Sequence, residues 1–80
     1  MDRDTVKAKL TDIFRKCFAD NALNLNDTMT ADDVKGWDSL TNINLILAVE
    51  RGFNVRMSTR EVRSLKNVGD LIALLEKKTA

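Results

Sequence analysis

Apolar residues recur at intervals of three and four in three stretches of this 80-residue chain, and no other feature constrains its fold as strongly. Such spacing places apolar side chains on one face of an α-helix, whereas a half-buried strand alternates apolar and polar residues. No stretch alternates in that way, so the sequence predicts an all-α fold. The three apolar sets are Val6, Leu10, Ile13, Phe14, Cys17 and Phe18; Leu40, Ile43, Leu45, Ile46, Leu47 and Val49; and Val68, Leu71, Ile72, Leu74 and Leu75.

Residues that favour helix ends set the expected boundaries of the first two helices. The first helix is expected over about residues 4–19. The second is expected to begin at Asp38 or Ser39 and to run to about Arg51. Gly52 then follows as its expected C-terminal cap, because glycine adopts the left-handed conformation at little cost.

Two further helices are expected in the second half of the chain. Ser58 and Glu61 have the spacing of a capping box, in which each side chain accepts from the other's backbone N–H, and they open a short helix ending near Leu65. The last helix starts near Asn67. The prediction is a four-helix bundle with three main helices and one short helix, forming a single domain over residues 1–80 with one modest core.

A long loop over residues 20–38 connects the first two helices. It is rich in Asn, Asp and Thr, whose side chains compete for backbone hydrogen bonds. Residues 30–33 favour one short helical turn within it. A loop this long in a small domain is usually functional or contains a further element. Four apolar residues are expected to anchor it: Leu23, Leu25, Met29 and Val34.

Composition narrows the possible functions. The 13 Lys and Arg against 12 Asp and Glu give a net charge of +1, without the basic excess of a general nucleic-acid binder. The chain has no histidine and Cys17 is its only cysteine, so it can form neither a Ser-His or Cys-His couple nor an internal disulfide. We assign no catalytic residue and no metal site, and we expect Cys17 to pack as a buried thiol. Without a signal-peptide core or an apolar run of about 18 residues, we expect a cytoplasmic protein that does not insert into membranes.

Charge is unevenly distributed along the chain. Residues 1–38 carry six Lys or Arg and eight Asp or Glu, a net charge of −2, whereas residues 39–80 carry seven and four, a net charge of +3. The basic excess lies between Arg51 and Lys66, where only Glu61 opposes it. This segment is either a solvated helical face or a docking surface for an acidic partner.

The run Gly36-Trp37-Asp38-Ser39-Leu40 places a serine where the second helix begins. A Ser or Asp in this position is ordinarily the N-cap, because its side-chain oxygen accepts from the free backbone N–H groups of the first turn. A serine at the junction of a loop and a helix is also exposed to modifying enzymes. Ser39 is therefore either a helix cap or an attachment site.

The order of these features resembles the acyl carrier protein family over nearly the whole chain. The features that match are the first helix, the long loop, Asp38-Ser39-Leu40, a long second helix closing with Val49-Glu50-Arg51-Gly52-Phe53, a short third helix and a last helix opening at Asn67-Val68. The Gly36-Trp37 lead-in is similar to discrete, stand-alone carriers of specialised pathways.

The resemblance implies that Ser39 carries a covalent 4'-phosphopantetheine arm. A phosphopantetheinyl transferase would supply it from coenzyme A with a magnesium ion, the Ser39 hydroxyl attacking the β-phosphate. The terminal thiol would hold an acyl group as a thioester for acyl-loading and acyl-transferring enzymes of a specialised fatty-acid, polyketide or related pathway. The chain itself is expected to be a monomer and not an enzyme.

The resemblance also implies roles for the residues beside the serine. Asp38 would contact the transferase or its metal, or would only cap the helix. Leu40, Ile43 and Leu47 match partner-facing positions of the family, with ordinary core packing as the alternative. Trp37 either seals the loop onto the bundle or shields the arm near its root.

The chain departs from the family in its charge. Acyl carrier proteins are typically acidic, and their second helix usually presents carboxylates to basic patches on enzymes. Here Thr41 and Asn44 occupy positions where acids are common, and Arg60 and Arg63 stand on the third helix. We expect these arginines to contact a dedicated set of partners, and steering toward standard fatty-acid synthase enzymes to be weak or reversed.

Three other functions remain open on the sequence. An aminoacyl or peptidyl carrier would share the serine, the bundle and the arm. An unmodified helical interaction module would use Leu40, Ile43 and Leu47 as a groove for a partner's helix. A nucleic-acid module would use residues 51–66, although the short helix in that segment has no Asn or Gln to contact base edges.

Overall fold

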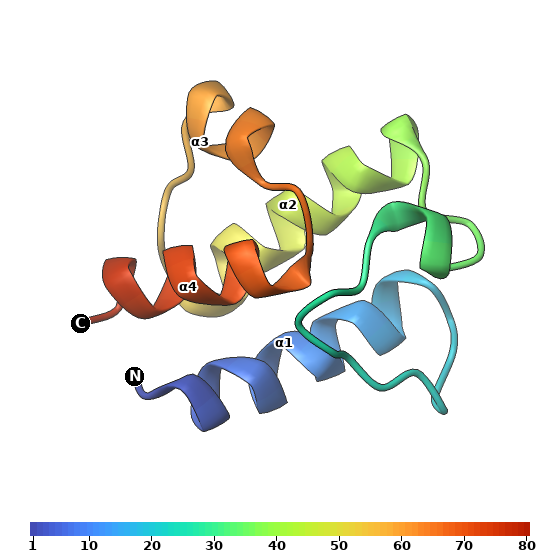
Figure 1. Cartoon of the computed structure of the whole chain (residues 1–80), viewed down its shortest axis with the longest axis horizontal. Helices are drawn as coiled ribbons and strands as arrows, with labels where there is room; N and C mark the ends of the chain where they lie inside the picture. Colours follow the sequence, from blue (N-terminus) through green and yellow to red (C-terminus); the bar gives the residue numbers. More distant parts are fainter.

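The computed structural model describes the whole chain, residues 1–80, and contains no strand. Its elements in chain order are α1 Arg3–Cys17, the 3-10 turn η1 Ala31–Asp33, α2 Ser39–Phe53, α3 Thr59–Ser64 and α4 Val68–Lys78 (Figure 1). The expected all-α class, with three main helices, one short helix and a long first loop, is confirmed. The helical turn expected at residues 30–33 is confirmed as η1.

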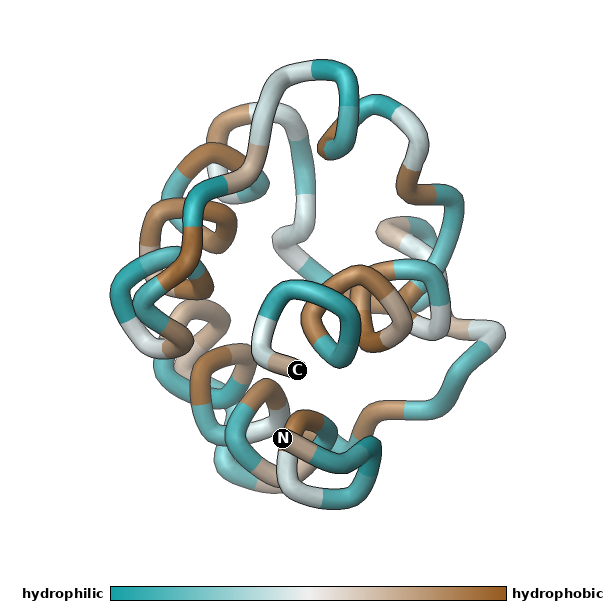
Figure 2. The backbone as a smooth tube through the Cα atoms, turned by 90° about the vertical axis from the view of Figure 1, so that its left-hand side faces the viewer, coloured by the Kyte–Doolittle hydropathy of each residue, from teal (hydrophilic) through white to brown (hydrophobic).

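Helix α1 packs against both α2 and α4, while the short α3 lies on the side away from α1 (Figure 1). The two ends of the chain lie close together, as both Figure 1 and Figure 2 show. The N-terminal ammonium of Met1 donates a hydrogen bond to the carbonyl oxygen of Thr79 at 2.9 Å. This arrangement leaves α3 and the outer face of α2 without a covering element.

The core is formed by the apolar faces of α1, α2 and α4, together with one side chain of the long loop. Teal and brown segments alternate around the turns of the helices in Figure 2, as expected for amphipathic helices. Burying one Val, Leu, Ile or Phe side chain stabilises the fold by roughly 1.5–3 kcal/mol relative to leaving it exposed. The buried cluster consists of Val6, Leu10, Phe14, Leu25, Leu45, Val49, Phe53, Val68, Leu71, Ile72 and Leu75.

Side-chain caps begin each of the helices around this core. Asp2 caps α1 by accepting from the backbone N–H of Thr5 at 2.8 Å, and this bond holds the pKa of its carboxyl below the usual value. The capping box of Ser58 and Glu61 is confirmed, with the two reciprocal hydrogen bonds at 2.9 and 3.1 Å. Asn67 caps α4. Because these caps depend on residues close in sequence, the observed helix starts lie close to the predicted ones.

The expected end of α2 at Gly52 is wrong. The helix continues to Phe53, and Asn54 is the C-cap in the left-handed conformation at φ 54°. Asparagine is the next most tolerant residue in that conformation, so it can replace glycine in this role. Gly52 instead allows close packing, because a Cβ built on it would lie 2.7 Å from Cδ1 of Ile13.

The long loop is fastened to the bundle at its midpoint. Arg3 forms a salt bridge with Asp27, and two backbone N–H groups at the start of α4 donate to the loop. Val68 donates to the carbonyl of Met29 and Gly69 to that of Asp27, both at 2.8 Å. The loop therefore enters α2 from a fixed position.

Replacing Gly69 by alanine is expected to destabilise the protein by about 1–3 kcal/mol. An alanine Cβ at this position would lie 2.8 Å from the carbonyl oxygen of Asp27, and that backbone atom is already held by the Gly69 N–H. Gly52→Ala is the matched control, because its Cβ would meet only the flexible end of Ile13. Alanine favours the helix over glycine by about 1 kcal/mol, which offsets the cost of moving the end of the Ile13 side chain. Urea denaturation of both variants measures this difference: the midpoint of Gly69→Ala should be lower than that of Gly52→Ala. Equal midpoints would contradict the prediction.

Cys17 is half-buried on the inner side of α1. Burial raises the pKa of its thiol, which keeps the sulfur protonated and unreactive at neutral pH. This environment agrees with packing as a small apolar side chain. No helix of the structure has the length and apolar character needed to cross a membrane.

Candidate functional site

The site begins at the first turn of α2, where Asp38 rather than Ser39 is the N-cap. One oxygen of Asp38, Oδ1, accepts from the backbone N–H groups of Leu40 and Thr41, both at 3.0 Å. The Thr41 hydroxyl completes a box by accepting from the N–H of Asp38 at 2.8 Å and donating to the carbonyl of Gly36 at 2.7 Å. The interpretation of Ser39 as the helix cap is therefore wrong, because the carboxylate one residue earlier already fills that position.

Ser39 occupies the first helical position and is exposed. Its hydroxyl takes no part in the capping hydrogen bonds, so a group added to its oxygen would break none of them. The positive end of the α2 helix dipole lies beside Ser39, although the N–H groups of Leu40 and Thr41 already donate to Asp38. This combination suits an anionic substituent on the serine.

The pKa of Asp38 is held below its usual value, first by the hydrogen bond from the backbone N–H of Thr41. A carboxyl group whose pKa is lower in the folded than in the unfolded state stabilises the fold above about pH 4, and this stabilisation is lost as pH falls through the folded value. Asp38→Asn is expected to reduce the loss of stability between neutral and acidic pH while keeping a cap. Thermal unfolding of both proteins from pH 7 to pH 3 measures this; identical pH profiles would contradict the role of the carboxylate.

Trp37 connects the site to the core. Its ring packs edge-on against Phe14 with the centroids 5.2 Å apart, and it lies 6.0 Å from the ring of Phe18. Its indole Nε1 donates to Oδ1 of Asn42 at 2.9 Å. The preceding Gly36 has φ 89°, a conformation that favours glycine, and it turns the loop into this position. Trp37 thus holds the entry of α2 against α1.

A cleft of about 400 Å³ opens beside Ser39 and runs between α2, α3 and α4. Its floor contains the buried Leu45 and Leu71, and its polar lining includes Asp38, Ser39, Asn42 and Lys66. Val62 and Leu65 of the α3 region share this cleft with Ser39, which the sequence did not predict. The main apolar lining residues are Trp37, Leu45, Ile46, Val62, Leu65 and Leu71.

Three large aliphatic side chains of α2 are exposed on the side opposite the core. Leu40, Ile43 and Leu47 are 71%, 58% and 47% exposed, in contrast to the fully buried Leu45 and Val49 of the same helix. Their spacing of three and four residues places them on one stripe that starts next to Ser39. Ordinary core packing of these three residues is therefore excluded, and their partner-facing role stays a prediction.

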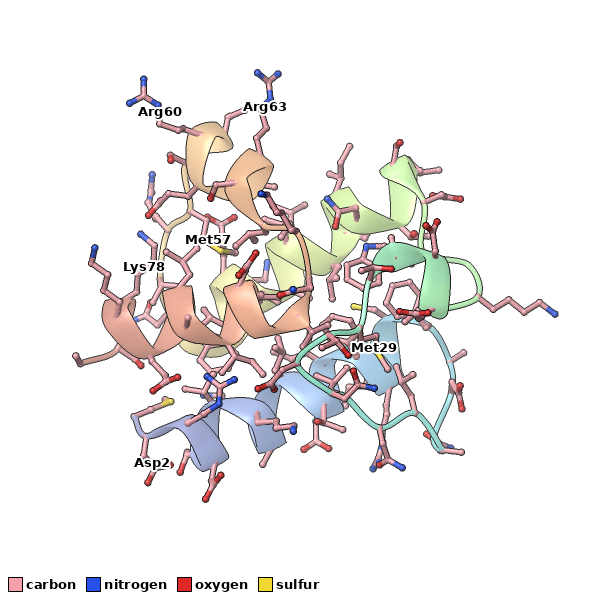
Figure 3. All side chains as sticks on the ribbon, in the orientation of Figure 1. Asp2, Met29, Met57, Arg60, Arg63 and Lys78 are labelled. Atoms are coloured by element: carbon pink, nitrogen blue, oxygen red, sulfur yellow. The ribbon has the colours of Figure 1, made fainter.

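Arg60 and Arg63 lie apart from the candidate residues that line the cleft at the start of α2. Both arginines lie on α3 with their guanidinium groups extending away from the bundle (Figure 3), and neither lines the cleft. Trp37, Asp38 and Ser39 come together at the start of α2 and all contribute to the cleft. The candidate residues therefore form one group that lines the cleft and a separate exposed surface.

Comparisons with known proteins identify the family. No family model matches the chain. A curated acyl carrier protein of Akkermansia muciniphila is 34% identical over 56 residues, which cover 65% of this chain and 70% of that protein. The solution structure of a holo acyl carrier protein from Geobacter metallireducens superposes with a TM-score of 0.85 and 42% identity, over 92% of this chain and 84% of that one. The chain belongs to the acyl carrier protein family, and it is a carrier rather than an enzyme.

Proposed function

We propose that this protein carries acyl groups as thioesters on a 4'-phosphopantetheine arm attached to Ser39. The observation that carries the proposal is the exposed Ser39 hydroxyl at the first position of α2, with Asp38 as the helix cap. Membership of the family supports the arm, since the Geobacter metallireducens relative is a holo protein. The arm supplies a thiol on which the cargo is held.

The residues around Ser39 fit a phosphodiester and a flexible arm. The N–H groups of Leu40 and Thr41 donate to Asp38, so the positive end of the α2 dipole is what favours a phosphate on the serine. The adjacent cleft, with buried leucines in its floor and polar side chains in its lining, has room for part of the arm or of its cargo. Asp38 fixes the backbone of the first turn of α2 and lies where a transferase must approach Ser39.

The proposed partners are a phosphopantetheinyl transferase and enzymes that load and transfer acyl groups. Leu40, Ile43 and Leu47 form the apolar contact next to the arm, and Trp37 holds the loop that leads to it. We further propose that residues 1–80 act as one monomeric carrier domain in the cytoplasm, in a specialised fatty-acid, polyketide or related acyl-transfer pathway. The departure from the acidic charge of the family favours such a dedicated role.

Intact mass spectrometry tests the proposal after incubation with a broad-specificity phosphopantetheinyl transferase, coenzyme A and Mg²⁺. The expected result is a gain of one phosphopantetheinyl group per chain. Loading of the holo protein with an acyl-activating enzyme, compared with an aminoacyl-adenylating enzyme, then separates an acyl carrier from an aminoacyl carrier. An unchanged mass with the source organism's own transferase would remove the basis of the proposal.

A further inference from the structure

The last turn of α2 and the segment between α2 and α4 carry five basic side chains that are free of ion pairs. All five are exposed, and none takes part in the salt bridges of the structure, which use Arg3, Lys7 and Lys78. We call this set the basic surface; it consists of Arg51, Arg56, Arg60, Arg63 and Lys66.

The acidic residues nearest in sequence to the basic surface are already engaged elsewhere. Glu61 forms a salt bridge with Lys78 at 3.0 Å and accepts from the backbone N–H of Ser58. The side chain of Glu50 accepts from the N–H of Met57 at 2.9 Å. Neither carboxylate forms a salt bridge with a member of the basic surface, so its five cations have no ion-pair partner within the chain.

Two members of the basic surface, Arg51 and Arg56, extend the exposed apolar stripe of α2. Arg51 follows Leu47 by four residues, as Leu47 follows Ile43, so the guanidinium group extends the same stripe by one turn. Arg56 lies next to Arg51, on the rim of a shallow depression at the end of α2. The outer face of the molecule therefore runs from Ser39 through apolar residues to arginines.

We propose that the enzymes acting on this carrier dock through an acidic face, which is the opposite polarity to the basic patches that serve acidic carriers. Carboxylates of the partner would meet the basic surface, and an apolar socket would receive Leu40, Ile43 and Leu47. The inference rests on the proposed attachment of the arm to Ser39. Charge complementarity of this kind raises the rate of association and excludes partners of the wrong sign.

A protein partner fits this face better than an anionic membrane. The stripe begins next to Ser39, so whatever covers it must also admit the arm, as an enzyme with an active-site entrance does. The stripe holds three aliphatic side chains, and the only tryptophan of the chain is packed against Phe14 rather than exposed. Membrane-surface helices instead combine a larger apolar face with exposed aromatic residues.

The test uses the source organism's phosphopantetheinyl transferase, the one enzyme that attachment at Ser39 requires. We expect kcat/KM for transfer to the wild-type chain to fall about tenfold between 25 and 250 mM NaCl. Arg60→Glu/Arg63→Glu is expected to lower kcat/KM about tenfold at low salt, through KM rather than kcat. Lys16→Glu/Lys77→Glu is the control, because it changes net charge equally at two exposed lysines outside the basic surface.

Each outcome of this test bears on the inference. Modification at Ser39 that is insensitive to salt and to the Arg60 and Arg63 changes would overturn the acidic docking face while leaving the attachment intact. An equal loss of kcat/KM in Lys16→Glu/Lys77→Glu would show that only net charge matters, and it would also overturn the acidic docking face. Sedimentation with phosphatidylglycerol vesicles that depends on Arg60 and Arg63, with transfer unaffected, would assign the surface to membranes. Absence of any transfer to Ser39 would refute both proposals together.

Discussion

Ser39→Ala is expected to abolish attachment of the arm completely and to leave the free energy of unfolding within about 0.5 kcal/mol of wild type. The change removes the only proposed acceptor oxygen. It keeps the Asp38 cap, since that carboxylate bonds to the backbone of Leu40 and Thr41 and not to Ser39. Intact mass after transferase treatment and urea denaturation are the two measurements. A holo form of the variant would show that another residue is the acceptor.

Ser58→Ala provides the reciprocal control. Ser58 accepts from the backbone N–H of Glu61 at 3.1 Å and starts α3, so its loss is expected to cost about 1 kcal/mol of stability. The variant should still receive the arm, since the turn around Ser39 is untouched. Comparing Ser39→Ala with Ser58→Ala thus distinguishes a serine that carries the arm from a serine that caps a helix. A stability loss in Ser39→Ala as large as that in Ser58→Ala would contradict the assignment of Asp38 as the cap of α2.

Phe14→Ala is expected to destabilise the protein by about 3–5 kcal/mol, the largest effect of any substitution considered. Phe14 is fully buried, and its ring contacts both Phe18 and Trp37. A chain of this length has a total stability of about 4–12 kcal/mol, so the variant should be close to unfolding at 25 °C. Fluorescence of Trp37, the only tryptophan, reports this directly, because it loses its edge-on neighbour.

Leu47→Ala is the matched control for the core substitution. It also removes a large apolar side chain, but one that is 47% exposed on the outer face of α2. Its effect on unfolding is expected to stay below about 1 kcal/mol, because most of the area is already in water. If Phe14→Ala and Leu47→Ala lowered the stability equally, the division of the bundle into a core and an outer face would be wrong.

Helical spacing predicted the three main helices because burial of an apolar face largely determines where amphipathic segments of this length form. The starts of α3 and α4 followed from Ser58 and Asn67, whose caps are local in sequence. The end of α2 could not be predicted from local sequence, because Gly52 and Asn54 are both suitable C-caps. Only packing against Ile13 gives the glycine its separate role.

The site was predicted less completely than the fold. Asp38 and Ser39 have similar capping preferences, so local chemistry alone did not decide which of them leaves its oxygen free. The cleft depends on how α3 lies against α2 and α4. The spacing of apolar residues within one helix does not predict contacts between helices that are distant in sequence. The salt bridge of Glu61 with Lys78, which leaves Arg60 and Arg63 without an ion-pair partner on α3, likewise appears only in the folded chain.

The most direct test of the central claim is peptide mass spectrometry of the protein purified from its own cells. Trypsin cleaves after Lys35 and Arg51, giving a peptide of residues 36–51 in which Ser39 is the only serine. We predict that this peptide carries one phosphopantetheinyl group, and that fragmentation places the group on Ser39. Recovery of the peptide only in its unmodified form, or of the group on any other residue, would contradict the account of this chain as an acyl carrier acting through Ser39.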